Sequence, residues 1–162
     1  MTLVVRAGRA ADAAALAALS RAAIEQSAAG HYSPTQLAAW AARRSEEAHA
    51  RYLATTTVLV AELDGAVAGF ASVALTAVGG LVPGEVDQLF VAPSAAGRGV
   101  ARALLTAVES AARAAGLASL TTHASWRAAP VFERMGYLQV AVETVAVDGE
   151  TLTRARMEKP LG

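Results

Sequence analysis

The chain has 162 residues, a length typical of a single domain, and its 14 Lys+Arg residues balance its 14 Asp+Glu residues. Balanced charge provides no overall field for nucleic acid or an anionic membrane surface, and we expect neither as a partner. The sequence has no cysteine, no apolar run near the ~20 residues that cross a bilayer, and no signal-peptide pattern at its start. These features exclude disulfides and thiolate metal sites and predict a cytoplasmic protein.

The first half of the sequence predicts a strand, two helices and a hairpin. Ser33 and Gln36 form a capping box around Pro34, a pattern typical of the start of a helix. The pair Asp64-Gly65 suits a two-residue turn in which both residues need a positive φ, and β-branched residues flank it. The expected elements are a strand at 2–5, a helix from Asp12 to before Gly30, a helix from Pro34, and hairpin strands at 55–63 and 66–77.

The second half alternates strands with helices that end at glycines. Gly116 follows a run of apolar residues at helical spacing and stands where a left-handed cap is favoured. Asp148-Gly149 predicts a closing hairpin turn. The expected elements are strands at 85–91, 117–124, 138–147 and 151–157, and helices at 99–115 and 128–134. This order predicts one α/β domain over residues 1–162, in which helices cover a mixed sheet.

A glycine turn joins the strand at 85–91 to the helix that follows it, with the sequence Ala-Gly-Arg-Gly-Val-Ala at residues 96–101. Because glycine has no Cβ, successive backbone N–H groups can converge on an anion at the positive end of the helix dipole. The turn therefore predicts a binding site for phosphate or pyrophosphate, although two glycines alone more often serve only to permit a tight turn. The P-loop Lys-Ser/Thr is absent, and Arg102 replaces the third small residue of a dinucleotide fingerprint.

The same segment resembles the acetyl-CoA-binding motif of the GNAT superfamily of N-acetyltransferases, Gln/Arg-x-x-Gly-x-Gly/Ala. Gly99 and Ala101 match its fourth and sixth positions, while Ala96 stands where the family usually has Gln or Arg. Residues 91–93, Val-Ala-Pro, resemble the V-x-P that usually precedes the motif. Residues 124–137 look like the later family motif, in which a strand and a short helix lead to Gly-Phe/Tyr.

This resemblance implies a GNAT-like fold, in which a central, mostly antiparallel sheet has splayed middle strands and helices on both faces. It also implies acetyl-CoA as co-substrate, no metal, and acetyl transfer to a primary amine of a small molecule or peptide. The amine would attack directly, with help from a general base. The residues that the resemblance places on acetyl-CoA are Leu89, Phe90, Val91, Ala96, Gly97, Arg98, Gly99, Val100, Ala101, Arg102, Ser125 and Phe132.

Three residues are candidate bases, which the reaction needs because an ammonium group cannot attack. Strand alternation places Glu85, Asp87 and Leu89 on one face and the intervening residues on the other. Glu85 sits where many family members carry an acidic base, and Asp87 lies nearer the expected cofactor. His123 ends the neighbouring strand and has an ordinary pKa suited to proton transfer. A solvated strand carboxylate is the alternative for either acid.

The leaving thiolate lacks the tyrosine that commonly protonates it in this family, because Phe132 occupies that position. Ser125, Tyr137, water or no dedicated acid are the alternatives, since a thiol with a pKa near ~8.5 leaves readily as the thiolate. Phe132 and Ala96 keep a second hypothesis open, a non-catalytic acyl-CoA sensor or regulator. A nucleotide-phosphate binder of another class is the third.

The acceptor is not identified by the sequence. Tyr32 and Trp40 lie in the region that resembles the acceptor-binding part of the family, although a tryptophan at helical spacing with Leu37 is typical of a core. His31 and His49 are expected at the surface, and the three histidines of the chain show no metal-site spacing. Either a monomer or a homodimer fits these features.

Overall fold

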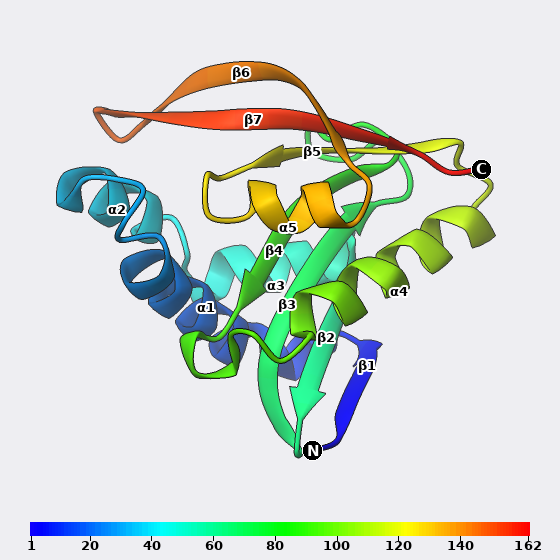
Figure 1. The fold of residues 1–162 in the computed structure, drawn as a ribbon. Coiled ribbons are helices and arrows are strands. Elements are labelled where there is room, and N and C mark those ends of the chain that lie inside the picture. The colour runs from blue at the N-terminus through cyan, green and yellow to red at the C-terminus, as the bar shows by residue number, and fades with distance from the viewer.

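The fold is built on one seven-stranded sheet with strand order β1-β2-β3-β4-β5-β7-β6 (Figure 1). This computed structural model describes residues 1–162, with the side chain of Ser27 left aside. Neighbouring strands are antiparallel except β4 and β5, which run parallel. The strands are β1 Leu3–Ala7, β2 Thr57–Leu63, β3 Ala66–Ala74, β4 Glu85–Val91, β5 Ser119–Ala124, β6 Leu138–Val147 and β7 Glu150–Pro160.

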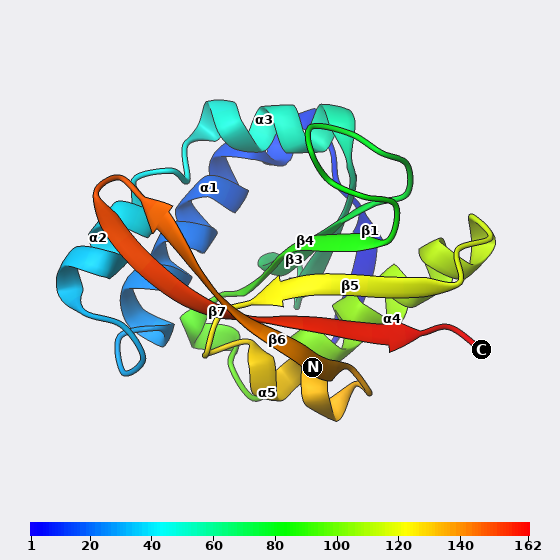
Figure 2. The ribbon, with the colours of Figure 1, turned by 90° about the horizontal axis from the view of Figure 1, so that it is seen from above.

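Helices cover both faces of the sheet. Viewed from above, α1 and α3 lie on one side of β3 and β4, and α4 and α5 lie on the other (Figure 2). Helix α2 lies near the tip of the β6–β7 hairpin, which it contacts. The helices are α1 Ala13–Ala22, α2 Pro34–Ala41, α3 Glu46–Thr55, α4 Val100–Ala114 and α5 Ala129–Arg134; shorter helical turns are Ala10–Asp12, Ala23–Ser27 and Pro93–Ala95.

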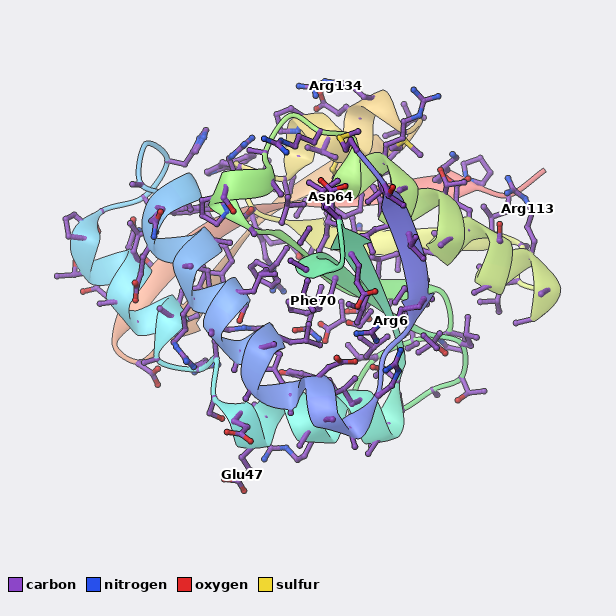
Figure 3. All side chains as sticks on the ribbon, turned by 90° about the horizontal axis from the view of Figure 1, so that it is seen from below. Arg6, Glu47, Asp64, Phe70, Arg113 and Arg134 are labelled. Carbon is purple, nitrogen blue, oxygen red and sulfur yellow. The ribbon has the colours of Figure 1, made fainter. Side chains whose placement is uncertain are left out.

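Each face of the sheet has its own apolar core. On the α4 side, Leu104 and Val108 are fully buried and pack with Val73 of β3. On the α1 side, Phe70 is fully buried among the helices, where it packs with Leu16 (Figure 3). Burial of one such side chain stabilises the fold by about 1.5–3 kcal/mol. The two cores hold β3 and β4 between them and so fix the middle of the sheet.

The sheet splits between β4 and β5. These strands pair at only two positions, Glu85 with Thr121 and Val86 with Thr122, and then diverge (Figure 1). The closed end of the split depends on Gly84, which has a φ of +89°. A Cβ on Gly84 would lie 2.5 Å from the carbonyl oxygen of Ser119, so a side chain there would push the two strands apart.

A register shift in β4 corrects the expected alternation of its side chains. Ser72 of β3 pairs with Gln88 and Val73 pairs with Val86, which leaves Asp87 without a partner residue on β3. Val86 packs into the α4-side core, whereas Gln88 bonds to Ser72 and Arg44 on the other side. The expectation that Val86 and Gln88 share a face is therefore wrong, because the bulge adds one residue between them.

The predicted mixed α/β sheet is confirmed, as are both tight turns. Asp64-Gly65 has φ values of 52° and 85°, and Asp148-Gly149 has 48° and 83°. One helix was missed: α3 begins after Ser45, and the expected start of a strand at residue 55 is its last residue. No helix in the part of the chain that the structure describes is long and apolar enough to cross a membrane.

Candidate active site

The glycine turn opens the N-terminus of α4 toward solvent. Gly97 has a φ of 77°, and Gly99, the N-cap of α4, has a φ of 80°. A Cβ placed on either glycine would meet no atom within 4 Å, so the space in front of the turn is empty. The first N–H groups of a helix have no partner within it, and the helix dipole makes this end positive. The turn therefore presents an accessible anion-binding end.

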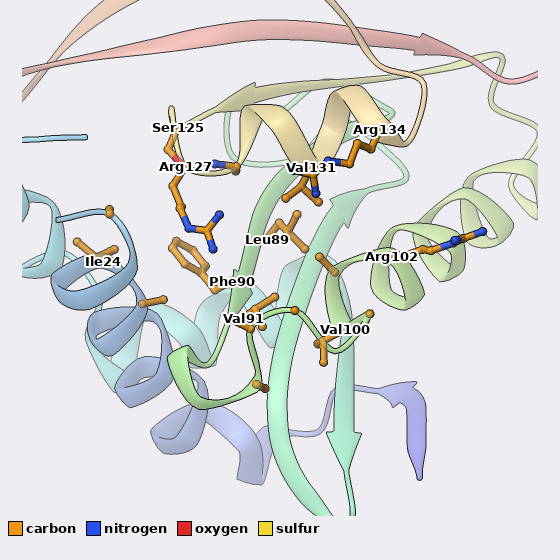
Figure 4. Close-up of a pocket in the computed structure, with 18 of the residues that line it drawn as sticks. Ile24, Leu89, Phe90, Val91, Val100, Arg102, Ser125, Arg127, Val131 and Arg134 are labelled. Carbon is orange, nitrogen blue, oxygen red and sulfur yellow. Dashed lines mark hydrogen bonds between the residues drawn. The ribbon is translucent and has the colours of Figure 1, made fainter. Parts of the chain in front are cut away.

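A first cavity of about 560 Å³ lies beside this turn, between β4, α4 and α5 (Figure 4). Every residue predicted to hold acetyl-CoA lines it except Arg98 and Phe132. Arg98 is exposed outside the cavity. Sequence reasoning missed the part of the wall formed by the helical turn that follows α1 and by α5 with its flanking residues. The missed lining residues include Ala23, Ile24, Ala28, Arg127, Val131, Arg134 and Met135.

Three arginines line the first cavity from two directions. Arg102 comes from α4, and Arg127 and Arg134 come from the α5 segment (Figure 4). Among the described residues, none of the three forms an ion pair with a carboxylate. Guanidinium groups without protein counterions suit a ligand that carries several phosphates.

The edge of β4 that faces β5 is open along this cavity. Past Val86 the strand has no ladder partner on that side, and residues Leu89–Val91 line the cavity. Unpaired backbone N–H and C=O groups at a strand edge can bind an extended ligand that carries amides. An extended chain can therefore enter the sheet where its strands separate.

A second cavity of about 310 Å³ continues from the first on the side of the β6–β7 hairpin. Two of the three candidate bases, Asp87 and His123, line it, and Glu85 lines neither cavity. The two cavities share lining residues where the strands diverge, so they form two parts of one cleft. The shared residues are Trp40, Leu89, Phe90, Ser125 and Ala128.

Asp87 is positioned by the bulge of β4 and is exposed to the second cavity. Desolvation by the protein around it raises the pKa of Asp87, and the negative charge of Glu85 raises it further. The positive charge of Arg44 opposes this shift. A carboxylate with a raised pKa in a cleft accepts a proton more readily than an ordinary aspartate does.

His123 is held between two glutamates. Its Nδ1 lies 2.6 Å from Oε1 of Glu143, and its Nε2 lies 3.9 Å from Oε2 of Glu85. The hydrogen bond from His123 lowers the pKa of Glu143. Glu85 also accepts a bond of 3.2 Å from the Val82 N–H. Glu143 was not predicted, because its strand has no motif that marks it.

Phe132 and Tyr137 lie together in the core on the α4 side, with ring centroids 4.9 Å apart. Tyr137 is 1% exposed and lines neither cavity, so it cannot protonate a leaving group in the cleft. Burial raises its pKa as well. Phe132 lines the second cavity rather than the first. Ser125 lines both, and its hydroxyl accepts a bond of 3.2 Å from the Ala128 N–H.

Of the two histidines expected at the surface, one is exposed and the other is buried. His31 is exposed, as expected, but His49 is 1% exposed, so placing it at the surface is wrong. His49 lies on the inner face of α3, where its Nε2 is 3.1 Å from Nη2 of Arg44. The sequence held one signal for this helix, the Ser45 cap followed by two acidic residues, which is typical of a helix start.

Comparison with known proteins agrees with this architecture. The Acetyltransferase (GNAT) domain family matches residues 28–159. An uncharacterized N-acetyltransferase of Escherichia coli, YafP, is 34% identical over 135 residues, which cover 83% of this chain and 81% of that protein. The chain belongs to the GNAT acetyltransferase family. The recognition of this family from the glycine turn and the later motif is confirmed.

Solved GNAT structures share the fold. A GCN5-related N-acetyltransferase from Rhodopseudomonas palustris is 38% identical, with a TM-score of 0.90 over 99% of this chain and 97% of that one. The PaiA N-acetyltransferase of Thermoplasma acidophilum, solved in complex with coenzyme A, is 18% identical, with a TM-score of 0.75 over 99% of each chain. These likenesses confirm the predicted GNAT fold, and family membership makes the chain an acetyltransferase.

Proposed function

We propose that this GNAT-family acetyltransferase moves an acetyl group from acetyl-CoA to a primary amine that occupies the second cavity. The observation that carries the proposal is the meeting of the two cavities where β4 and β5 diverge. One cavity ends at a helix N-terminus and three unpaired arginines, and the other holds a carboxylate with a raised pKa. A ligand in each would meet the other at the shared wall.

The first cavity fits acetyl-CoA chemically. Backbone N–H groups from Gly97 to Arg102 would hold the pyrophosphate, and Arg127 and Arg134 would neutralise further phosphate charge. The open edge of β4 would hold the amide-bearing arm. When bound, acetyl-CoA would supply a thioester whose carbonyl carbon forms a bond to the amine nitrogen while its C–S bond breaks, and CoA would leave as the thiolate. This fit supports the notion of acetyl-CoA as co-substrate.

Asp87 is the proposed base. The amine must lose a proton before its lone pair can attack, and the Asp87 carboxylate lines the cavity that would hold it. The proton would pass from the ammonium group to the Asp87 carboxylate, directly or through one water. His123 lines the same cavity and is the alternative acceptor. Glu85 lies behind His123 and would act through it.

The proposal is tested by release of free CoA. With acetyl-CoA and a panel of primary amines, the protein should release CoA faster than acetyl-CoA hydrolyses alone. In a thermal-shift assay acetyl-CoA should raise the unfolding temperature, while ATP and NAD should not, because a ligand that binds the native state stabilises it. Stabilisation by acetyl-CoA without transfer to any amine would favour the non-catalytic sensor, which Ala96 and Phe132 keep as the second candidate.

A further inference from the structure

Arg44 is a buried cation in the wall of the second cavity. It lies in the segment between α2 and α3 and is 8% exposed, yet it lines that cavity. Its Cζ lies 4.9 Å from the ring centroid of Phe90, a residue shared by the two cavities. A guanidinium group is thus fixed close to where the two ligands would meet.

The hydrogen-bond partners of the Arg44 guanidinium are all neutral. Its Nη2 donates to the amide oxygen of Gln88 and lies 3.1 Å from Nε2 of His49, and its Nε lies 3.4 Å from the Ser20 hydroxyl. Burial and the charge of Arg44 lower the pKa of His49, so the imidazole stays neutral and accepts. These bonds orient the guanidinium and leave its charge uncompensated.

A buried charge without a counterion is costly, and proteins rarely keep one without use for it. No carboxylate in the described part of the chain forms an ion pair with Arg44. Burial lowers the pKa of Arg44, and Tyr52, followed by Asp87, opposes this shift. The other arginines of this cavity differ, because Arg43 pairs with Asp148 at 3.4 Å and Arg154 lies 3.6 Å from Glu143. Arg44 therefore lacks the anion that the others have.

Aromatic and aliphatic side chains form one part of the remaining wall of the second cavity, beside polar residues that include Arg43, His123 and Arg154. Five of the eight aromatic residues of the chain line it. They are Tyr32, Trp40, Tyr52, Phe90 and Phe132, and the hairpin adds Val145, Val147 and Leu152. The aromatic and aliphatic part of the wall suits the apolar side chain of a ligand, while one carboxylate, Asp87, faces the same space.

Building on the proposed function, we infer that the acceptor is an apolar amino acid, whose carboxylate binds Arg44 and whose amine faces Asp87. A carboxylate matches the planar guanidinium and completes the ion pair that the protein leaves open. The apolar side chain would lie against the aromatic wall. Arg44 thus determines which amines are acetylated.

The test compares acceptors that differ only at the carboxylate. Phenylalanine, phenylalaninamide and 2-phenylethylamine, and the matching acids, amides and amines of leucine, methionine and tryptophan, are assayed by CoA release. For at least one set, kcat/KM for the acid should exceed that for its amide tenfold or more, about 1.4 kcal/mol. The amide has the less basic amine, so a larger share of it is unprotonated at neutral pH, and protonation alone would favour the amide over the acid. Equal rates for acid and amide in every set would overturn the inference. Phosphoethanolamine, an amine that carries a phosphate in place of the carboxylate, is assayed as well, and a preference for it over all the acids would also overturn the inference.

Variants then locate the preference. Arg44→Met should bring the ratio of acid to amide to within about threefold of one, and Arg44→Lys should retain part of it, because the charge remains. Arg51→Gln is the matched control, since Arg51 is exposed on α3 and pairs with Glu47. A parent-like ratio in a folded Arg44→Met variant would contradict the role of Arg44. Should that variant not fold, the acid and amide comparison in the parent still decides.

A binding measurement separates this inference from the proposed function. Calorimetry on the CoA-loaded protein compares each acid with its amide without requiring transfer. Tighter binding of an acid with no transfer to any amine would sustain the anion site and refute acetylation of amines. Transfer at equal rates to each acid and its amide, with equal binding of the two, would support acetylation of amines and refute the anion site. Acids that neither bind more tightly nor react faster than their amides would remove the proposed site.

Discussion

The two parts of the cleft are made in different ways. The first cavity is formed mainly by backbone and small residues of one contiguous stretch, from Leu89 to Arg102, together with α5. The second is formed by long side chains from separate segments, including Arg44 before α3, His123 on β5 and Arg154 on β7. Backbone geometry suits the unchanging phosphates of a shared co-substrate. Side chains can be exchanged singly, so they suit an acceptor that differs among relatives.

This comparison predicts that the two halves of the cleft can be damaged independently. The largest effect should follow from Asp87→Asn, which keeps the shape of the residue but removes its ability to take a proton. Turnover should fall by roughly 10²-fold or more, while affinity for acetyl-CoA should stay unchanged. Steady-state kinetics and calorimetry measure the two quantities separately.

The pH profile and two further variants sharpen this test. The pKa of Asp87 is raised, so the acid limb of kcat/KM should lie above the range of an ordinary aspartate and disappear in Asp87→Asn. Glu85→Gln should act more weakly, since Glu85 reaches the cavity only through His123. Parent-like turnover in Asp87→Asn together with a loss in His123→Ala would transfer the role of base to the histidine.

The sequence predicted the first half of the cleft well because its signals are local. Gly97 and Gly99 require a backbone conformation that glycine favours, and the helix that follows has a strong apolar face. Predicting the second half would have required knowing which distant segments pack together. Helix α3 carries few large apolar residues on its buried face, with Ala48 and His49 there, so its periodicity is weak.

Asp87 shows within a single strand that local sequence signals do not reveal long-range pairing. Alternation predicted the faces of β4, and one register shift against β3 changed them. No local residue type marks that bulge, because it depends on how Ser72 and Val73 pair across the sheet. Arg44 likewise has no local signal in the sequence, because its surroundings depend on Gln88 of β4 and on the missed helix that carries His49.

The second largest effect should follow from Gly99→Val, which acts on the first cavity. A branched side chain would enter the open space in front of the turn and strain a residue with a φ of 80°. Affinity for acetyl-CoA should fall at least tenfold, more than about 1.4 kcal/mol, as measured by calorimetry. Preference among acceptors should not change.

Gly116→Val is the control for backbone strain. Gly116 follows the other end of α4 with a φ of 78°, and a Cβ there would also meet no atom within 4 Å. Both variants should lose similar stability, so only the position relative to the cavity distinguishes them. Equal affinities for acetyl-CoA in the two folded variants would show that the turn does not hold the phosphates.

A smaller effect should follow from Tyr32→Phe in the second cavity. The Tyr32 hydroxyl donates to the carbonyl of Thr153 at 3.1 Å and accepts from the Trp126 N–H at 3.0 Å, which joins two walls. Its loss should lower the free energy of unfolding by about 1 kcal/mol, measured by urea denaturation. Tyr137→Phe is the matched control: among described groups its hydroxyl has no partner, so we expect little or no loss. Equal losses would contradict this account.

The last prediction concerns the pH dependence of stability and the histidine that supports Arg44. His49 Nδ1 lies 2.8 Å from the Ser45 carbonyl oxygen, which it reaches as a donor, so Nε2 is left to accept from Arg44. Protonation would turn Nε2 into a donor facing a guanidinium. Burial, followed by the charges of Arg44 and Arg21, therefore lowers the pKa of His49, although its bond to Ser45 opposes the shift.

The sign of the effect follows from this lowered pKa. Above the ordinary histidine value of about 6.5, His49 is neutral in both the folded and the unfolded chain and contributes no pH dependence. As the pH falls below that value the unfolded chain binds a proton that the folded chain resists, so stability is lost toward the folded pKa, at up to about 1.4 kcal/mol per pH unit. Urea denaturation between about pH 8 and 5 should show a shallower decline for His49→Gln than for the parent. His31→Gln changes an exposed histidine and should follow the parent. If the free energy of unfolding falls with pH equally in His49→Gln and the parent, His49 is not held neutral. Arg44 would then lack the neutral imidazole that we propose as its hydrogen-bond acceptor beside the second cavity.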